Sequence, residues 1–187
     1  MHERFGIKDL GAADWLLGLA VERDWDKGTI TLHQGAFIRD LVKRFGLEDA
    51  GTSPLPLSPD FRLFPEGDHQ SSPCSPAERE IYKSLIGSLL YAAIGTRPDI
   101  QTAISQLCRV QADPTSAHLS ALKGVLRYLK GTADLGITFG GTSGPLVLEA
   151  FSDSDYATAS NVEARKSTSG HAFLLAGGPV SWFSKLQ

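Results

Sequence analysis

The chain is poor in cysteine and carries no long hydrophobic run. Its 187 residues include two cysteines, Cys74 and Cys108, which have neither the spacing of a metal site nor that of a disulfide framework. No stretch approaches the ~20 consecutive apolar residues that cross a bilayer, and the first residues lack the basic and apolar regions of a signal peptide. We therefore expect an intracellular chain, cytoplasmic or nuclear, without membrane contact.

Neither sign of charge dominates the sequence. Its 18 Lys and Arg stand against 21 Asp and Glu, and the net charge of −3 argues against a free-standing nucleic-acid binder. The balance is uneven, however, because residues 77–132 hold seven Lys and Arg but four Asp and Glu. Hydrophobic residues make up 42% of the chain, enough to bury a core. We expect a globular protein with one basic segment.

Three successive helices are predicted in the middle of the chain. The first begins with a capping box at Ser75-Pro76-Ala77-Glu78 and ends at Gly95. Thr96-Arg97-Pro98-Asp99 repeats this start for a second helix, which ends before Pro114. The third follows at once and ends at Gly131, which we expect to be a left-handed C-terminal cap. The short connections predict a compact three-helix cluster.

A hairpin and a short helix are predicted ahead of this cluster. The apolar run at 15–21 and the alternating residues 29–32 indicate two strands, joined by a turn that contains Lys27-Gly28. Apolar residues then recur at helical spacing over 35–45, and Gly46 fits a C-terminal cap. Residues 49–76 are rich in Pro and Ser and predict an extended linker along the surface.

Strands are predicted again after the helices. The patterns favour strands at 135–139, 146–152, 171–175 and 180–183, with a Gly-Gly-Pro turn between the last two. We therefore predict an α+β fold with four segments. They are residues 1–48 (hairpin and helix), 49–76 (linker), 77–132 (helical cluster) and 133–187 (an incomplete sheet).

Two groups of polar residues are candidates for function. Lys123, Arg127 and Lys130 share one face of the third predicted helix and suit contacts with a phosphate backbone, although cations near a helix C-terminus also stay solvated and complement the helix dipole. Asp153 and Asp155 follow a predicted strand, where carboxylates suit a divalent ion. An Asp-Ser-Asp sequence after a strand is also typical of a turn held by side-chain hydrogen bonds.

A series of motifs in fixed order resembles the Pol polyprotein of copia-type LTR retrotransposons. The resemblance covers nearly the whole chain and rests on Phe-Gly-Ile-Lys-Asp-Leu-Gly at 5–11, Ile-Gly-Ser-Leu-Leu-Tyr at 86–91, Thr-Arg-Pro-Asp-Ile at 96–100, Leu-Arg-Tyr-Leu-Lys-Gly-Thr at 126–132, Ser-Asp-Ser-Asp at 152–155, Ser-Thr-Ser-Gly at 167–170 and Ser-Trp at 181–182.

The resemblance implies a position within a larger enzyme of transposable elements. Residues 1–48 resemble the end of the reverse transcriptase palm and the first thumb helix, and 77–132 resemble the thumb and connection region. The strands in 133–187 resemble the start of an RNase H domain, in which Asp153 matches the first metal-binding aspartate and the cofactor is Mg²⁺. The implied partners are an RNA/DNA hybrid or template-primer and the remaining palm and RNase H parts. The implied location includes a cytoplasmic virus-like particle.

Three hypotheses about function remain open. The first is a nucleic-acid-binding scaffold without polymerase or nuclease activity of its own, because the family's Tyr-x-Asp-Asp motif and the later RNase H carboxylates are not found in this sequence. The second is Mg²⁺-dependent hydrolysis of RNA in hybrids, carried by Asp153 and Asp155. The third is a decayed, non-catalytic interaction module, with which Gly124 in the middle of a helix is compatible.

Overall fold

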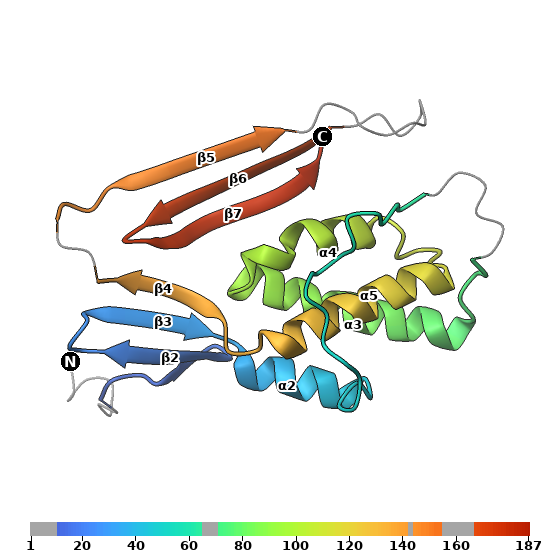
Figure 1. Cartoon of the computed structure of the whole chain (residues 1–187), viewed down its shortest axis with the longest axis horizontal. Coiled ribbons are helices and arrows are strands. Elements are labelled where there is room, and N and C mark those ends of the chain that lie inside the picture. The colour runs from blue at the N-terminus through green and yellow to red at the C-terminus, as the bar shows by residue number, and fades with distance from the viewer. Residues whose placement is uncertain (1–10, 65–70, 142–143, 155–166) are drawn as a thin grey trace, which may run out of the picture.

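The computed structural model describes residues 11–64, 71–141, 144–154 and 167–187, and within them a cluster of helices lies beside two antiparallel sheets (Figure 1). This confirms the mixed α+β class. The elements in chain order are β1 (Trp15–Leu16), β2 (Leu19–Asp24), β3 (Thr29–His33), α2 (Gly35–Arg44), α3 (Pro76–Gly95), the 3-10 turn Pro98–Ile100, α4 (Gln101–Cys108), α5 (Ser116–Gly131), β4 (Gly136–Gly140), β5 (Leu148–Ser154), β6 (Thr168–Leu175) and β7 (Gly178–Leu186).

Local capping sets the start of α3 and the end of α2. The Ser75 hydroxyl accepts from the Glu78 amide at 3.3 Å, and the Glu78 carboxylate accepts from the Ser75 amide at 2.8 Å. This confirms the predicted capping box. At the end of α2, Gly46 has a φ of +64° and the Leu47 amide donates to the carbonyl of Val42 at 2.9 Å. That is the Schellman arrangement.

Two predicted caps are wrong. Thr96 does not start the second helix, because its hydroxyl donates to Gln34 Oε1 at 2.9 Å and the chain enters α4 through a 3-10 turn. Gly131 is the last helical residue and is absent from the positions with positive φ. A side chain there would meet Thr52, since an added Cβ would lie 3.1 Å from the Thr52 Cβ. A glycine is favoured at position 131 because the linker packs closely against it, and not because the backbone is left-handed there.

The hydrophobic core lies where α2, α3, α4 and α5 meet. Tyr82 is fully buried, and its hydroxyl donates to the carbonyl of Leu107 at 2.8 Å. The apolar residues without exposed surface are Ile38, Leu41, Tyr82, Leu85, Leu89, Ala92, Ala93, Ile100, Ile104, Leu107, Leu122, Val125, Leu126 and Leu129. Truncating any of the leucines to alanine would cost about 2–5 kcal/mol. Both sheets contact this helical cluster, the first at Leu17, whose carbonyl accepts from the Tyr91 hydroxyl, and the second at Trp182.

The predicted turn at Lys27-Gly28 between two strands is confirmed, but the apolar run at 15–21 is not one strand. It divides into β1 and β2 at Leu17 and Gly18, whose φ angles are +50° and +78°, and the hairpin belongs to a larger sheet. β2 and β3 pair from Ala20–His33 to Asp24–Thr29, and Gly28 has a φ of +62° in the turn. β4 then pairs antiparallel with β3, with Leu32 opposite Ile137. The predicted strand at 135–139 was grouped with the C-terminal strands in segment 133–187, and this grouping is wrong: after α5 the chain returns to the exposed edge of the hairpin as β4.

The C-terminal strands form a separate sheet in the order β5-β6-β7. β6 and β7 are longer than predicted, whereas β5 has the predicted length but lies two residues further along the chain. Asp153 therefore lies within β5, opposite Gly170 of β6. β7 holds this sheet against the helices, because the Trp182 indole donates to the carbonyl of Ala93 at 2.9 Å and the Ser105 hydroxyl donates to that of Ser184 at 2.8 Å. β5 lies at the far edge, away from β4 (Figure 1).

The Pro-rich linker has no long regular element in its described parts, 49–64 and 71–75, as predicted. It is nonetheless packed, because Leu57, Phe61 and Leu63 lie against the helical core. An isolated bridge joins Pro73 to Thr115 at the start of α5. No helix in the part of the chain that the structure describes is long and apolar enough to cross a membrane.

Candidate functional site

Lys130 on α5 is held by the linker. Its ammonium group donates to the carbonyls of Leu47 at 3.2 Å and Ala50 at 2.7 Å, and also to that of Glu48. An ammonium group has three N–H donors, so the three carbonyls use all of them. Lys130 therefore fixes the start of the linker against the end of α5.

Arg127 makes a similar contact one turn earlier. Its Nε donates to the carbonyl of Gly51 at 2.5 Å, and its own carbonyl accepts from the Ser53 amide at 3.3 Å. A guanidinium group has five N–H donors, so Arg127 keeps others for further partners. The side chain is both an anchor for the linker and a cation at the surface.

Lys123 is the least engaged of the three predicted cations. It is half-buried and forms no ion pair with the described residues. The pKa of Glu78 lies below its ordinary value, chiefly because of hydrogen bonds from Ser75 and to a smaller extent because of the charge of Lys123. The three cations thus share one face of α5 as predicted, but the side chains of Arg127 and Lys130 hydrogen-bond to carbonyls of the linker.

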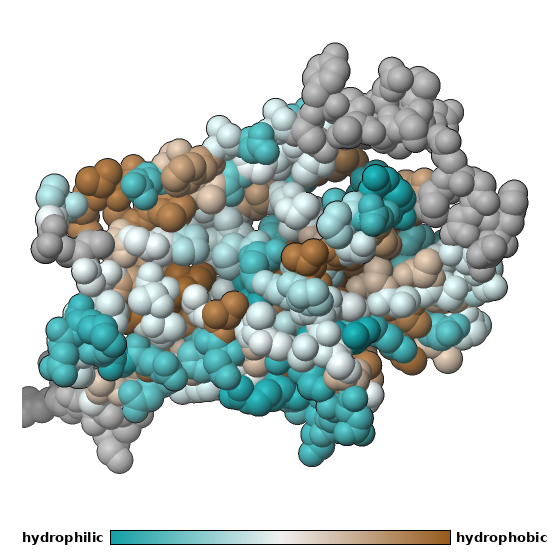
Figure 2. Space-filling view, in the orientation of Figure 1, coloured by the Kyte–Doolittle hydropathy of each residue, from teal (hydrophilic) through white to brown (hydrophobic). Residues whose placement is uncertain are grey.

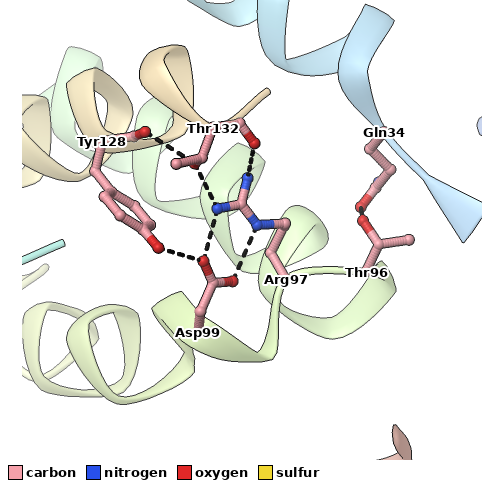
Figure 3. A network of polar contacts seen from close by, with 6 residues as sticks. All are labelled: Gln34, Thr96, Arg97, Asp99, Tyr128 and Thr132. Atoms are coloured by element: carbon pink, nitrogen blue, oxygen red, sulfur yellow. Dashed lines mark hydrogen bonds and ion pairs between the residues drawn. The ribbon is translucent and has the colours of Figure 1, made fainter. Parts of the chain in front are cut away.

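A buried arginine joins the helices close to this face, and its role was not predicted from the sequence. Arg97 is 1% exposed, and all its nitrogens have partners (Figure 3). Nε and Nη2 donate to the two oxygens of Asp99 at 3.0 and 2.6 Å, and Nη1 and Nη2 donate to the carbonyl and hydroxyl of Thr132 at 2.8 and 2.7 Å. Arg97 thereby ties the start of α4 to the end of α5.

Tyr128 completes this network. Its hydroxyl donates to Asp99 Oδ2 at 2.8 Å, and the Arg97 guanidinium lies 5.5 Å from the centre of its ring. Burial by itself would raise the pKa of the Asp99 carboxyl, but the hydrogen bonds and charge of Arg97, with the Tyr128 hydroxyl, hold that pKa below its ordinary value. Asp99 is therefore ionised at neutral pH and is the counterion of the buried Arg97.

Asp153 lies in a groove between the C-terminal sheet and α4. The groove has a volume of about 580 Å³. Its lining residues include Phe151 and Asp153 of β5, His171 of β6, and Thr102 and Gln106 of α4. Asp153 is exposed, and its Oδ1 accepts from the Ser154 amide at 2.8 Å. The other predicted aspartate, Asp155, lies outside the described residues.

The described residues do not fit a pair of Mg²⁺ ions at Asp153. Two ions about 4 Å apart require several carboxylates. Asp153 is the one carboxylate among the described residues that line the groove, and no group of three His, Cys, Asp or Glu in the described chain could hold a metal. The polar side chains that line the groove, which include Asp153, His171, Thr102 and Gln106, can form hydrogen bonds.

Local sequence signals explain which contacts were foreseen. The helical spacing of Lys123, Arg127 and Lys130 placed them on one face, but their carbonyl partners lie about 80 residues away in the chain, for example at a separation of 80 for Ala50. The sequence indicates the burial of Arg97 less clearly than it indicates the shared face of the three cations. An arginine directly before a Pro-Asp step can turn back onto that aspartate, as Arg97 does here.

Three relatives illustrate what the chain is similar to. It is 34% identical over its full length to the retrovirus-related Pol polyprotein from transposon TNT 1-94 of Nicotiana tabacum, and 35% identical over its full length to that from transposon RE1 of Arabidopsis thaliana. A stretch covering 57% of the chain is 44% identical to secreted RxLR effector protein 161 of Plasmopara viticola and spans 72% of that protein. No family model and no solved structure matches the chain.

The match to the polyproteins covers every segment of the fold. The chain spans 14% of the length of the first polyprotein and 12% of the second. The aligned region thus includes both sheets and the helical cluster that carries the Arg97 network. By this full-length similarity, the chain belongs to the copia-type retrotransposon Pol polyproteins.

Proposed function

We propose that the chain is the part of a copia-type Pol polyprotein that runs from the end of the reverse transcriptase palm, through thumb and connection, into the start of an RNase H domain. The observation that carries the proposal is the similarity to Pol polyproteins over the full length of the chain. Its role is to supply scaffold and contacts for an RNA/DNA hybrid or template-primer inside the cell. The palm and the rest of the RNase H domain are its polypeptide partners.

The arrangement of α5 supports a division of labour among the three cations. Lys130 has all its donors on linker carbonyls, so it positions the face and does not contact phosphate. Lys123 and Arg127 retain free donors at the surface and carry the phosphate contacts. Each such contact releases counterions and makes binding sensitive to salt.

Affinity for a hybrid duplex, measured across a range of salt concentrations, tests this role. Replacing Lys123 and Arg127 by glutamine should weaken binding and lower the slope of log K against log salt by about 1 for each phosphate that is no longer neutralised. A variant with the same loss of charge away from α5, Lys27→Gln with Lys185→Gln, should keep the wild-type slope. Identical slopes for all three proteins would defeat the proposed role of α5, provided that circular dichroism shows each variant to be folded.

The C-terminal sheet is, in this proposal, the beginning of an RNase H-like domain that does not cleave RNA by itself. The lack of fit to a metal pair at Asp153 supports this view for the described residues. Incubation of the chain with a labelled hybrid and Mg²⁺ or Mn²⁺ should leave the RNA intact. Cleavage that disappears in an Asp153→Asn variant would replace the scaffold role with the hydrolytic one.

A non-catalytic interaction module is the second candidate. It is favoured by the relative of which the chain covers 72%, a protein described as a secreted effector and not as a polyprotein. Under this alternative the chain folds by itself and has no affinity for a hybrid duplex at low salt. The binding measurement above separates the two candidates.

A further inference from the structure

The two sheets meet where the turn between β6 and β7 lies against the end of β4 (Figure 1). The Gly140 amide at the end of β4 donates to the carbonyl of Ala176 in that turn at 2.9 Å. Gly178, at the start of β7, is buried, and a Cβ added to it would lie 2.6 Å from both the Thr138 carbonyl oxygen and the Phe139 ring. Figure 2 shows mainly pale and brown surface, neutral or hydrophobic, between the sheets at this end. The sheets therefore approach each other backbone to backbone, which a glycine permits.

The backbone of this turn is strained. Ala176 has a φ of +51° and Gly177 has a φ of +81°, so two successive residues are left-handed, as in a type I′ hairpin turn. Alanine rarely takes this conformation, because its Cβ crowds the following carbonyl oxygen. Strain of this kind persists where the surrounding contacts hold it in place. The hydrogen bond from Gly140 to the Ala176 carbonyl is such a contact.

The C-terminal sheet has a second anchor further along β7. The Trp182 indole donates to the carbonyl of Ala93, and the Ser105 hydroxyl donates to that of Ser184. Trp182 lies four residues beyond Gly178, about 13 Å along an extended strand. One anchor alone would let the sheet pivot about it, whereas a second anchor at a different point holds its orientation. The turn at 176–178 therefore decides how the C-terminal sheet is oriented against the first sheet.

The composition of the connection between the sheets predicts the opposite behaviour. Residues 140–145 read Gly-Gly-Thr-Ser-Gly-Pro, and Gly/Ser-rich segments act as flexible linkers between folded parts. A flexible connection would let the two sheets move independently. Its first two residues are nonetheless tied to both sheets, because Gly140 donates to Ala176 and Gly141 donates to the carbonyl of Gly28 at 3.2 Å.

From these contacts we propose that the β6–β7 turn is a docking element for the end of β4, with Gly178 as its positioning residue, and that it fixes the C-terminal sheet in one orientation against the first sheet. Gly178 lets the turn approach the backbone of β4, and the Ala176 carbonyl then pairs with Gly140. One consequence rests on the proposed function: the reverse transcriptase part and the RNase H-like part meet a bound hybrid at a fixed spacing.

Hydrogen exchange of two N–H groups, followed by NMR in the full chain without nucleic acid, tests the docking. In the wild type we expect protection of both the Gly140 amide and the Trp182 indole N–H. Gly178→Ala forces the turn away from the Thr138 carbonyl, so exchange at Gly140 should become faster by about tenfold or more, the effect of one lost hydrogen bond. The Trp182 indole should keep its rate, because the second anchor stays.

Gly170→Ala is the matched control in the same sheet. A Cβ added at Gly170 would lie 3.5 Å from the Phe183 carbonyl oxygen, an ordinary contact. This variant should leave exchange at Gly140 unchanged. If Gly178→Ala fails to fold, Phe139→Ala serves instead, because it removes the ring beside Gly178 and keeps the backbone pairing of β4 with β3.

A distance measurement follows the orientation directly. Nitroxide labels at Asp40 of α2 and Glu149 of β5 are read by double electron–electron resonance after Cys74 and Cys108 have been replaced by alanine. The wild-type distribution should be a single narrow peak, and Gly178→Ala should broaden it.

Three results would overturn the proposal. One is a Gly140 amide that exchanges freely in the wild type, and another is a Gly178→Ala variant with wild-type exchange and an unchanged distance distribution. The third is equal acceleration at Gly140 and at the Trp182 indole, which would mean that the substitution unfolds the sheet instead of undocking it. These measurements contain no nucleic acid, so a failure of the proposed role of α5 would leave them unchanged.

Discussion

The guanidinium of Arg97 and the carboxylate of Asp99 form a two-pronged ion pair, with distances of 3.0 Å from Nε to Oδ1 and 2.6 Å from Nη2 to Oδ2. The arginine side chain is 2% exposed and the aspartate side chain is 34% exposed. A buried charge without its partner is strongly unfavourable. The stability of the junction between α4 and α5 therefore depends on the carboxylate of Asp99.

Removal of that carboxylate should destabilise the fold. We expect Asp99→Asn to lower the free energy of unfolding by about 3–5 kcal/mol, because it leaves the Arg97 charge buried without a counterion. Urea denaturation at neutral pH measures this loss. The control is Asp113→Asn, which breaks the exposed pair with Arg79 and should cost about 0–1 kcal/mol. Similar losses for both variants would contradict the role of burial.

The same pair predicts how stability depends on pH. The pKa of Asp99 is lowered in the folded chain from its ordinary value of 3.8, so folding favours the ionised form. The stabilisation is fully present above about pH 5 and is lost as the pH falls below 3.8 through the folded pKa. The difference in stability between wild type and Asp99→Asn should therefore shrink on acidification. A difference that stays constant from pH 7 to pH 2 would show that ionisation is not the cause.

Lys130 should contribute more to stability than Lys123. Replacing Lys130 by methionine keeps the aliphatic chain but removes one donor from each of three linker carbonyls, of which only that of Leu47 also accepts from the Ala50 amide. We therefore expect a loss of about 2–3 kcal/mol and faster hydrogen exchange of amides in 47–53. Lys123→Met should change stability by less than about 0.5 kcal/mol. Equal effects of the two substitutions would mean that the carbonyl contacts do not hold the linker.

Two glycines should respond in opposite directions to alanine. Gly46 has a φ of +64° at the end of α2, so Gly46→Ala should destabilise the chain by about 1–2 kcal/mol. Gly124 lies inside α5, where an added Cβ meets no atom within 4 Å, so Gly124→Ala should stabilise it by about 0.5–1 kcal/mol. Thermal melts of the two variants compare them directly. A stabilising Gly46→Ala would contradict the left-handed cap.

The sequence predicted the elements whose signals are local. The capping box at Ser75, the end of α2 at Gly46 and the N-terminal hairpin follow from residues within a few positions of one another. Thr96 carried an equally good local signal, but its hydroxyl reaches Gln34, 62 residues earlier. Long-range partners outcompete local caps when the helix end is buried, because a buried polar group needs whichever partner is within reach.

The candidate site was predicted in part for the same reason. Helical spacing placed Lys123, Arg127 and Lys130 on one face, but nothing near them in sequence indicates that linker carbonyls occupy Lys130. The partner of β4 was assigned wrongly because alternation identifies a strand and its faces without identifying its neighbour. The metal-binding role of Asp153 and Asp155 stays a prediction.

The pairing of β4 with β3 constrains any attempt to dissect the chain. Thr31 and Thr138 face each other across this ladder, with their hydroxyl oxygens 2.8 Å apart, although 107 residues separate them. A shortened chain that starts at the linker would lack β3, so the backbone amides and carbonyls of β4 that pair with β3 would have no hydrogen-bond partners. Expression trials that cut between the hairpin and the helices should therefore yield aggregates, whereas co-expression of both pieces should restore a soluble complex.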